Sequence, residues 1–309
     1  MKRREFIRTT SAASVAAASA IIFGNLNSLF ASAPSGSSGE NFDMAAIMNG
    51  EPGEMFDKAI ESLGGMESFV KQGQTVVVKP NIGWDAIPER AANTNPQLIR
   101  RIIEKCYEAG ASEVYVFDYT CDEWRNCYKN SGIEDLAKEA GAKVVPGNFE
   151  KYYREVEIPQ GVSLKTAKVH ELILDSDVFI NVPVLKHHSS AELSIAMKNL
   201  MGIIWDRRYW HRNNLHQCIA DFSTYCKPDL NVIDAYRVMM KNGPRGVSGK
   251  DVVTYKTQIL ATNIVSADAA AAKVFGSEPA SIGYIKKASD MGVGSLDLES
   301  LKIDRIKLN

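Results

Sequence analysis

The histidines are the residues best suited to chemistry, and they are unevenly distributed along the chain. All five lie between residues 170 and 216, at His170, His187, His188, His211 and His216. Histidine is the commonest side-chain ligand of transition metals and carries protons near neutral pH. His187 and His188 are adjacent, so on an extended segment they point in opposite directions, and we expect only one of them in a site. The metal-binding spacing His-Glu-x-x-His is absent. For each histidine the alternative is that it has no functional role and lies on the surface or at the edge of the core.

A second set of polar residues lies where predicted strands end. In open parallel sheets, ligands bind beyond the carboxyl ends of the strands, where loops and helix N-termini meet. A strand-terminal aspartate also commonly caps the next helix, and this alternative stays open for Asp118 and Asp268. Taken together, these residues predict a shared cleft. The set comprises Lys79, Asn81, Asp118, Asn181, Lys186, Asp234 and Asp268.

Two further segments could hold an anion. Lys198 and Asn199 fall in the last turn of a predicted helix. A lysine there either interacts favourably with the negative end of the helix dipole or faces the cleft and holds an anion. The turn at 243–246 has the sequence Gly-Pro-Arg-Gly, whose backbone amides and Arg245 could approach an anionic group. A simple loop explains that turn equally well.

The elements that must position these residues alternate between strand and helix. Continuous apolar runs bounded by Gly, Pro or Asp predict buried strands at 74–79, 113–117, 143–145, 178–182, 230–233, 258–264 and 301–308. Helical spacing predicts helices at 55–70, 95–109, 133–140, 189–201, 215–226, 267–275 and 281–291. The helix at 189–201 is predicted from a capping box, Ser189-x-x-Glu192.

This alternation indicates the fold class. Strands separated by helices of such length favour right-handed crossovers and an α/β fold, with a mostly parallel sheet of the doubly wound type flanked by helices. The pattern breaks around residues 147–168, where we expect a small insertion such as a hairpin or lid.

The N-terminus has the parts of a twin-arginine signal peptide. Arg3 and Arg4 precede a weakly apolar stretch rich in Ala and Ser, and a small-x-small triplet ends at Ala33. We therefore expect a signal over residues 1–33, a linker over 34–54 and an α/β domain over 55–309. The expected partner is the twin-arginine translocase, and the expected location is the periplasm or another exported site. The stretch is too diluted with Ala, Ser and Asn to predict a lasting membrane span.

Charge gives no reason to expect nucleic acid as a partner. The whole chain has a formal net charge of −1, and residues 1–33 contribute +3, which leaves a mildly acidic −4 for the remainder.

The cysteines exclude some cofactors. The chain has no Cys-x-x-Cys, so it lacks the ligand pattern of a ferredoxin-type iron-sulfur cluster. Cys121 and Cys127 flank a short loop and could bridge in an oxidising compartment.

From Val76 to Gly294 the sequence resembles the family called domain of unknown function 362. The matching segments are 78–81, 177–187, 196–202, 216 with 221, 232–235, 242–244, 267–269 and 288–294. The most specific are Lys-Asn-Leu-x-Gly at 198–202 and Gly-Pro at 243–244. Relatives often carry an added module with cysteine ligands for iron-sulfur clusters, and this chain has no such ligands. The resemblance implies a fold and a site position, but no reaction.

Two functions from different classes follow. The first is an exported enzyme with a metal- or cofactor-assisted site that acts on a small anionic substrate. Its catalytic groups would be His187, His216, Asp234 and Lys198, and its divalent metal ligands His187, His216 and Asp221. Its anion-binding groups would be Lys79, Asn81, Lys186, Asn199 and Arg245. We expect His187 or His188 to meet His216 and the two lysines Lys79 and Lys198 in one pocket beside Asp234.

The second function is a non-catalytic protein that binds a metal or anion, or an accessory protein of an exported redox complex. A buried, convergent cluster of Lys, His and Asp would favour the enzyme, whereas charges spread over an open face would favour the binding protein. Nucleophilic hydrolysis is a weaker third alternative, because no Gly-x-Ser-x-Gly elbow occurs.

Overall fold

The computed structural model describes residues 29–30 and 42–309. The predicted signal segment, apart from Leu29 and Phe30, and the Ser/Gly-rich stretch after it lie outside the described residues. Within the described ranges, none of the helices combines the length and the apolar character needed to cross a membrane.

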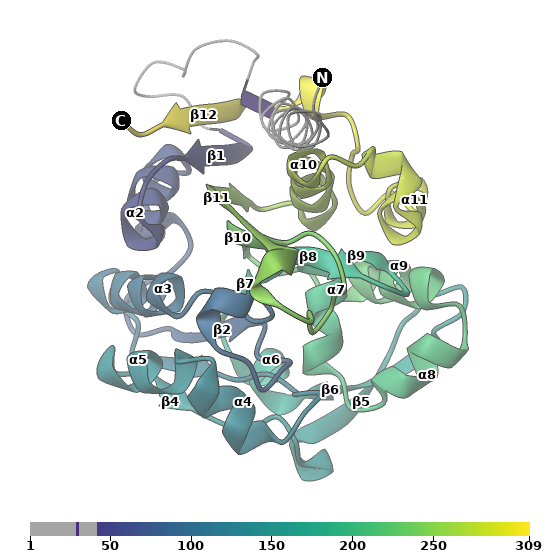
Figure 1. The fold of residues 1–309 in the computed structure, drawn as a ribbon. Helices are drawn as coiled ribbons and strands as arrows, with labels where there is room; N and C mark the ends of the chain where they lie inside the picture. The colour runs from purple at the N-terminus through teal and green to yellow at the C-terminus, as the bar shows by residue number, and fades with distance from the viewer. Residues whose placement is uncertain (1–28, 31–41) are drawn as a thin grey trace, which may run out of the picture.

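A ten-stranded mixed sheet lies at the centre of the described part of the chain, in the order β12-β1-β11-β10-β7-β2-β3-β4 (Figure 1). Off this path, β8 pairs with β10, and β9 pairs with β8. The run from β10 to β4 is parallel, as is the pair β12–β1, whereas β11 is antiparallel to both its neighbours and β9 is antiparallel to β8. The predicted mostly parallel α/β class is thus confirmed. The strands are β1 (Met44–Met48), β2 (Thr75–Pro80), β3 (Glu113–Val116), β4 (Lys143–Val144), β7 (Val178–Val182), β8 (Val184–His188), β9 (Glu192–Ser194), β10 (Leu230–Met239), β11 (Val252–Ala261) and β12 (Ile303–Lys307).

Helices cover both faces of this sheet (Figure 1), and a separate apolar core fills each interface. On one face lie α2 (Pro52–Ser62), α3 (Pro96–Glu108), α4 (Trp124–Asn130) and α5 (Ile133–Glu139). On the other lie α7 (Ala196–Asn199), α8 (Arg207–Arg212), α9 (Leu215–Tyr225), α10 (Ile264–Phe275) and α11 (Gly283–Asp290).

Local sequence explains α3 well. The Asn95 side chain caps the helix by accepting a hydrogen bond from the amide of Gln97, and Pro96 occupies its first turn. Leu98, Ile102 and Cys106 are fully buried on one stripe, as their spacing requires.

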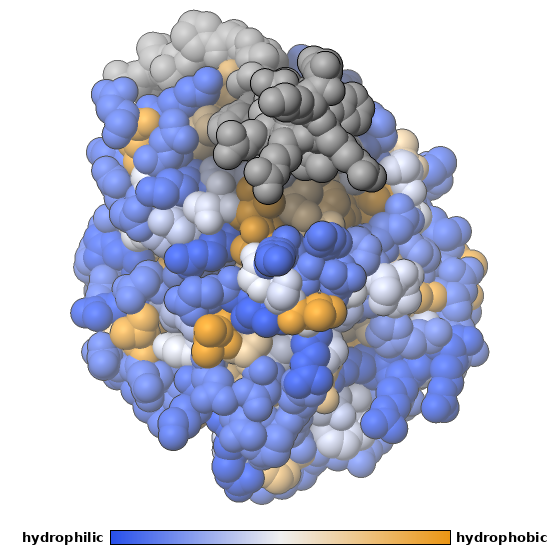
Figure 2. Space-filling view, in the orientation of Figure 1, coloured by the Kyte–Doolittle hydropathy of each residue, from blue (hydrophilic) through white to orange (hydrophobic). Residues whose placement is uncertain are grey.

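The predicted insertion is a separate two-stranded sheet. β5 (Tyr153–Glu157) and β6 (Thr166–His170) pair as an antiparallel hairpin, and the short helix α6 (Glu171–Asp175) leads from it back to β7. The hairpin lies at the end of the molecule away from β12 (Figure 1). The face seen in Figure 2 is mainly hydrophilic, with small apolar patches rather than one continuous apolar surface.

Two segments differ from the sequence expectation. Part of the predicted linker over 34–54 belongs to the domain, because Met44–Met48 forms β1 and pairs with β11 and β12. The predicted helix over 189–201 begins only at Ala196, because β9 pairs with β8 and Asp268, distant in sequence, caps the helix instead of Ser189.

Candidate anion-binding site

Three lysines converge on a cavity of about 290 Å³ at the carboxyl ends of β2 and β3. We call this cavity the lysine pocket and define it by Lys79, Lys186 and Lys198. Its other lining residues come from the loops after β2 and β3, from β8 and β9, from α7 and the 3-10 helix after it (Leu200–Ile203), and from α8. They include Asn81, Trp84, Asp118, Tyr119, Cys121, His188, Ser194, Asn199, Arg207 and His211.

Lys79 is fully buried in β2 and forms an ion pair with Asp118 at 2.9 Å. Burial lowers the pKa of Lys79, and the negative charge of Asp118 opposes that shift. The second carboxylate oxygen of Asp118 accepts a hydrogen bond from the amide of Ile82 at 2.7 Å. Gly202 passes so close that a Cβ there would lie 1.8 Å from Asp118 Oδ1. The pair is therefore enclosed, and position 202 has no space for a side chain.

Two asparagines connect the lysines. Asn199 Oδ1 accepts from Lys79 Nζ at 2.8 Å and from the side-chain amide of Asn81 at 3.1 Å. The Asn199 amide in turn donates to Asn181 Oδ1 at 2.9 Å, and Lys186 Nζ donates to Asn81 Oδ1 at 3.1 Å. These neutral acceptors satisfy ammonium groups without cancelling their charge, so the pocket stays positive.

Lys186 enters the pocket from β8 and is 1% exposed. Its ammonium also donates to the carbonyl of Ala92. Burial lowers the pKa of Lys186 to about 7.

Lys198 differs from the other two lysines. It is partly exposed, lines the pocket, and has no hydrogen-bond or ion-pair partner in the part of the chain that the structure describes. Burial lowers its pKa to about 8, and the charges of Arg207 and Lys79 act in the same direction. The helix that carries it is anchored by Asp268, which accepts from the amides of Ala196 and Met197 at 2.7 and 3.1 Å.

Two histidines complete the lining. His188 Nδ1 accepts hydrogen bonds from the amides of Ser190 and Ala191, both at 3.2 Å, so its proton is assigned to Nε2. The His211 ring stacks on that of His188 with centroids 6.2 Å apart. Burial lowers the pKa of His188 to about 2 and that of His211 to about 4. Both rings are therefore neutral near pH 7, and His188 offers a neutral N–H donor.

Arg207 forms the remaining wall. Its guanidinium donates to the carbonyls of Tyr119 and Thr120 and lies 4.2 Å from the centre of the Tyr119 ring. Four basic side chains, those of Lys79, Lys186, Lys198 and Arg207, thus line the lysine pocket against a single carboxylate, that of Asp118.

The structure brings six of the residues predicted for the shared cleft or the anion site together here: Lys79, Asn81, Asp118, Lys186, Lys198 and Asn199. Of the adjacent pair of histidines, His188 lines the pocket and His187 does not, since His187 Nδ1 accepts from the amide of Gly243 at 3.1 Å. Arg245 is exposed, forms an ion pair with Asp122 at 3.4 Å and lies 6.0 Å from the Trp84 ring, beside the pocket.

The other predicted residues lie elsewhere, in structural roles. Asp221 accepts from the amides of Ser163 and Leu164 at 2.6 and 2.8 Å and from the Gln217 side chain at 2.8 Å. The His216 ring stacks on that of Tyr284 with centroids 6.0 Å apart. The predicted ligand set of His187, His216 and Asp221 is not assembled. Within residues 29–30 and 42–309, no three His, Cys, Asp or Glu side chains are grouped so that they could hold a metal ion.

Asp234 also lies outside the lysine pocket. The strand predicted to end there continues to Met239, so Asp234 sits within β10. Its carboxylate accepts from the amides of Asn95 at 2.7 Å and Tyr236 at 3.0 Å, and burial raises its pKa to about 6. It joins the start of α3 to the sheet.

Sequence reasoning missed Arg207, did not assign His211 to the site, and named His188 only as an alternative to His187. Arg207 and His211 are four residues apart, the spacing that places two side chains on one face of a helix. That spacing was the available signal. All five cysteines are free thiols in the structure, so Cys121 and Cys127 are not bridged in it.

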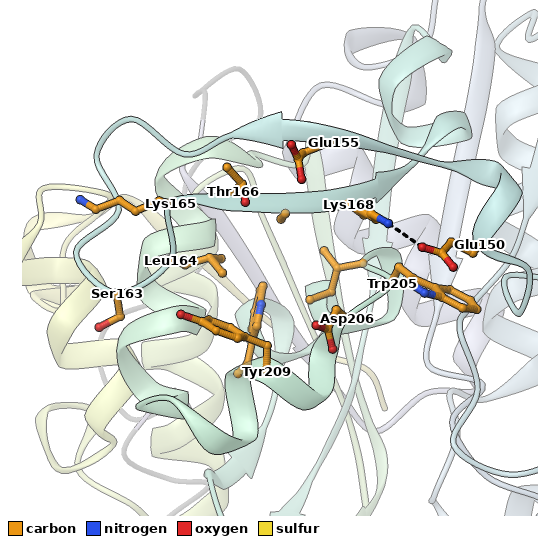
Figure 3. A pocket seen from close by; sticks show the side chains of 13 residues that line it. Glu150, Glu155, Ser163, Leu164, Lys165, Thr166, Lys168, Trp205, Asp206 and Tyr209 are labelled. Carbon is orange, nitrogen blue, oxygen red and sulfur yellow. Dashed lines mark hydrogen bonds and ion pairs between the residues drawn. The ribbon is translucent and has the colours of Figure 1, made fainter.

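A larger cavity of about 470 Å³ lies between the β5–β6 hairpin and the segment 204–210 (Figure 3). We call it the hairpin pocket and define it by Glu155, Lys168, Trp205, Asp206 and Tyr209. Glu155 and Lys168 come from the hairpin wall and Asp206 from the opposite wall, and Lys168 pairs with Glu150 at 2.5 Å. Charges of both signs line it, so it favours no charged ligand class.

Known proteins resemble this chain over most of the described domain. A thylakoid-associated protein of Synechocystis sp. is 26% identical over 193 residues, which cover 60% of this chain and 59% of that protein. The lactate racemase apoprotein of Thermoanaerobacterium thermosaccharolyticum matches with a TM-score of 0.44 at 12% identity, over 80% of this chain and 56% of that one. A Thermotoga maritima protein matches with a TM-score of 0.47 at 11% identity, over 79% of this chain and 60% of that one. The chain thus spans less than two thirds of the length of each of these proteins.

The family described as domain of unknown function (DUF362) matches residues 76–273. This match covers well over half of the chain and includes every lysine of the pocket, and the chain belongs to that family.

Proposed function

We propose that this protein is an exported enzyme that holds a small carboxylate- or phosphate-bearing substrate in the lysine pocket. The observation that carries the proposal is the charge of the lining. Lys79, Lys186, Lys198 and Arg207 face one cavity with Asp118 as the sole carboxylate among the lining residues. Burying like charges together is costly unless a ligand of opposite charge completes the group.

The donors suit an oxyanion. Lys198 has a free ammonium, and the assigned His188 tautomer presents Nε2–H, so two lining groups can donate to the same ligand. Charge-assisted hydrogen bonds from Lys or Arg to a carboxylate or phosphate are about twice as strong as neutral ones. An anionic organic cofactor would use the same donors, which is the form of cofactor assistance that these residues fit.

The burial of the site favours an enzyme over a passive binding protein. Lys198 has a pKa of about 8, so it can exchange a proton with a substrate near neutral pH without a large free-energy cost. Perturbed titrating groups in a cleft are typical of catalytic sites. A protein that only captured anions would not need an amine near its titration point.

The first experiment measures thermal unfolding of the purified protein with inorganic phosphate, glycolate, malonate or pyruvate. A ligand at one hundred times its Kd stabilises the folded state by about 2.7 kcal/mol, which raises the Tm measurably. Lys198→Ala should abolish the rise. His216→Ala is the matched control and should keep it, because His216 does not line the pocket. A Tm that none of the four anions shifts would contradict the proposal.

A second measurement separates the enzyme from the binding protein. NMR in deuterium oxide follows the carbon-bound hydrogens of whichever organic acid binds. Exchange or conversion that disappears in Lys198→Ala supports an enzyme. If an organic acid of the panel binds tightly but shows neither hydrogen exchange nor conversion, the result favours a binding protein.

Export is part of the proposal and rests on the paired arginines. Replacing Arg3 and Arg4 together with Lys keeps the charge but removes the guanidinium groups that the translocase would recognise. Cell fractionation should then find the protein in the cytoplasm. Unchanged export of that variant would contradict the twin-arginine route.

A further inference from the structure

Lys198 has a free amine in a pocket whose other cations are all engaged. Lys79 pairs with Asp118 and donates to Asn199. Lys186 donates to two oxygen acceptors, and Arg207 donates to two backbone carbonyls. Among the described residues, Lys198 alone of these four has no acceptor, so its nitrogen is available to react with a ligand.

The short helix that carries this amine is anchored from two sides. The amides that begin α7 donate to the buried carboxylate of Asp268. The residue after Lys198, Asn199, is held by Lys79, Asn81 and Asn181. A short helix anchored at both ends fixes the Cα from which Lys198 enters the pocket, and a covalent step requires a nucleophile held close to its substrate.

We propose that Lys198 forms an imine with a small aldehyde or ketone that also bears a carboxylate or phosphate group. This inference rests on the proposed function and names the substrate class of the same pocket. The neutral amine adds to the carbonyl carbon and forms a C–N bond. The nitrogen gives up its two hydrogens as protons, the carbonyl oxygen takes up two protons and leaves as water, and the C–N bond becomes the C=N double bond of the imine, with no oxidant or reductant needed.

The surroundings of Lys198 suit this chemistry. A lysine amine becomes a nucleophile when burial or a neighbouring cation lowers its pKa. With a pKa of about 8, roughly a tenth of Lys198 is neutral at pH 7, far more than for an exposed lysine. The charged and titratable groups that share the pocket with it are Lys79, Asp118, Tyr119, Cys121, Lys186, His188, Arg207 and His211. Their net charge is positive, which attracts the anionic end of the substrate.

The experiment traps the imine by reduction. The full-length protein is incubated with pyruvate or glyoxylate and sodium cyanoborohydride, and the stable secondary amine is located by peptide mass spectrometry. We expect the modification at Lys198, at a rate that rises with pH and levels off above about pH 8 as the amine becomes neutral. Exposed Lys250 reports the background, whose rate should still rise at that pH. Glycolate, which has no carbonyl group, should give no adduct.

Two variants separate this inference from the proposed function. Lys198→Arg keeps the positive charge but has no nucleophilic amine, so it should retain the Tm rise with phosphate and lose trapping to the background rate. Lys250→Arg is the matched control and should trap as well as the parent protein. If the parent binds phosphate but Lys198 is not trapped above background, the imine is refuted and the anion site stands. Trapping at Lys186 in place of Lys198 would also overturn the assignment. If no anion binds, the proposed function fails as well.

Discussion

The lysine pocket and the hairpin pocket share a wall but have opposite character. Arg207 and His211 of α8 line the lysine pocket, and Tyr209 and Trp210 of the same helix line the hairpin pocket. The hairpin pocket is larger, about 470 Å³ against 290 Å³. Its ion pair, Lys168–Glu150, has side chains that are 43% and 55% exposed, whereas those of Lys79–Asp118 are 0% and 2% exposed.

This difference shows that cavity size is a poor guide to the site. Water screens the charges of the hairpin pocket, so they pair without strain and need no ligand. In the lysine pocket, Lys79, Lys186 and Asp118 are buried and the basic side chains outnumber the carboxylate, so an incoming anion gains more. The smaller cavity is therefore the better candidate.

The largest expected effect comes from breaking each pocket's ion pair in turn. Lys79→Met leaves the Asp118 carboxylate buried without its cation, which should destabilise the protein by about 3–5 kcal/mol in urea unfolding. The matched variant in the hairpin pocket, Lys168→Met, should leave the unfolding curve unchanged, because its partner stays solvated. If both variants lose the same free energy of unfolding, the two ion pairs do not differ in the way proposed.

A smaller effect should follow from filling the space beside the Lys79–Asp118 pair. Gly202→Ala places a methyl group 1.8 Å from Asp118 Oδ1 and 2.6 Å from Lys79 Nζ, so the pair must move. Overpacking of this kind costs about 1–3 kcal/mol, and we expect weaker phosphate binding as well. Gly249→Ala is the control, since no atom lies within 4 Å of the added carbon. A Gly202→Ala protein with parental stability and affinity would show that the pair is not enclosed.

The smallest effect concerns pH and sharpens the role of Lys198. Its pKa is lowered to about 8, so the ammonium that binds an anion is present below that pH and is lost above it. For a ligand whose charge is constant over the range, such as malonate, affinity should fall about tenfold, or about 1.4 kcal/mol, per pH unit well above pH 8. Calorimetric titrations of the parent protein and of Asp206→Asn in the hairpin pocket should give the same curve. A flat curve for the parent would exclude Lys198 as the main anion partner.

Much of the fold could be predicted from local patterns. The continuous apolar runs at β2 and β7 are buried, as central parallel strands must be, and α3 begins at its predicted cap. β1 could not be found this way, because five residues of strand carry too little periodicity to identify. Its neighbours in the sheet, β11 and β12, lie more than 200 residues further along the chain.

Part of the candidate site was also predictable from local patterns. Lys79 and Asn81 follow a recognisable strand, and Lys198-Asn199 belongs to a distinctive segment, so these residues were predicted by type and place. Which aspartate joins them was not predictable. Asp118 faces Lys79, whereas Asp234 and Asp268 accept backbone amides from segments far away in sequence.

The sequence by itself thus determined the α/β class, most of its strands and helices, and the lysines and asparagines of the pocket. Only the tertiary structure decided that His188 and not His187 lines it, that Arg207 closes it, and that Asp221 and His216 stand outside. The physical reason is that local sequence sets backbone conformation within a few residues. Which side chains come together in a pocket is decided by strand order and helix packing, and these are set by contacts across the whole chain.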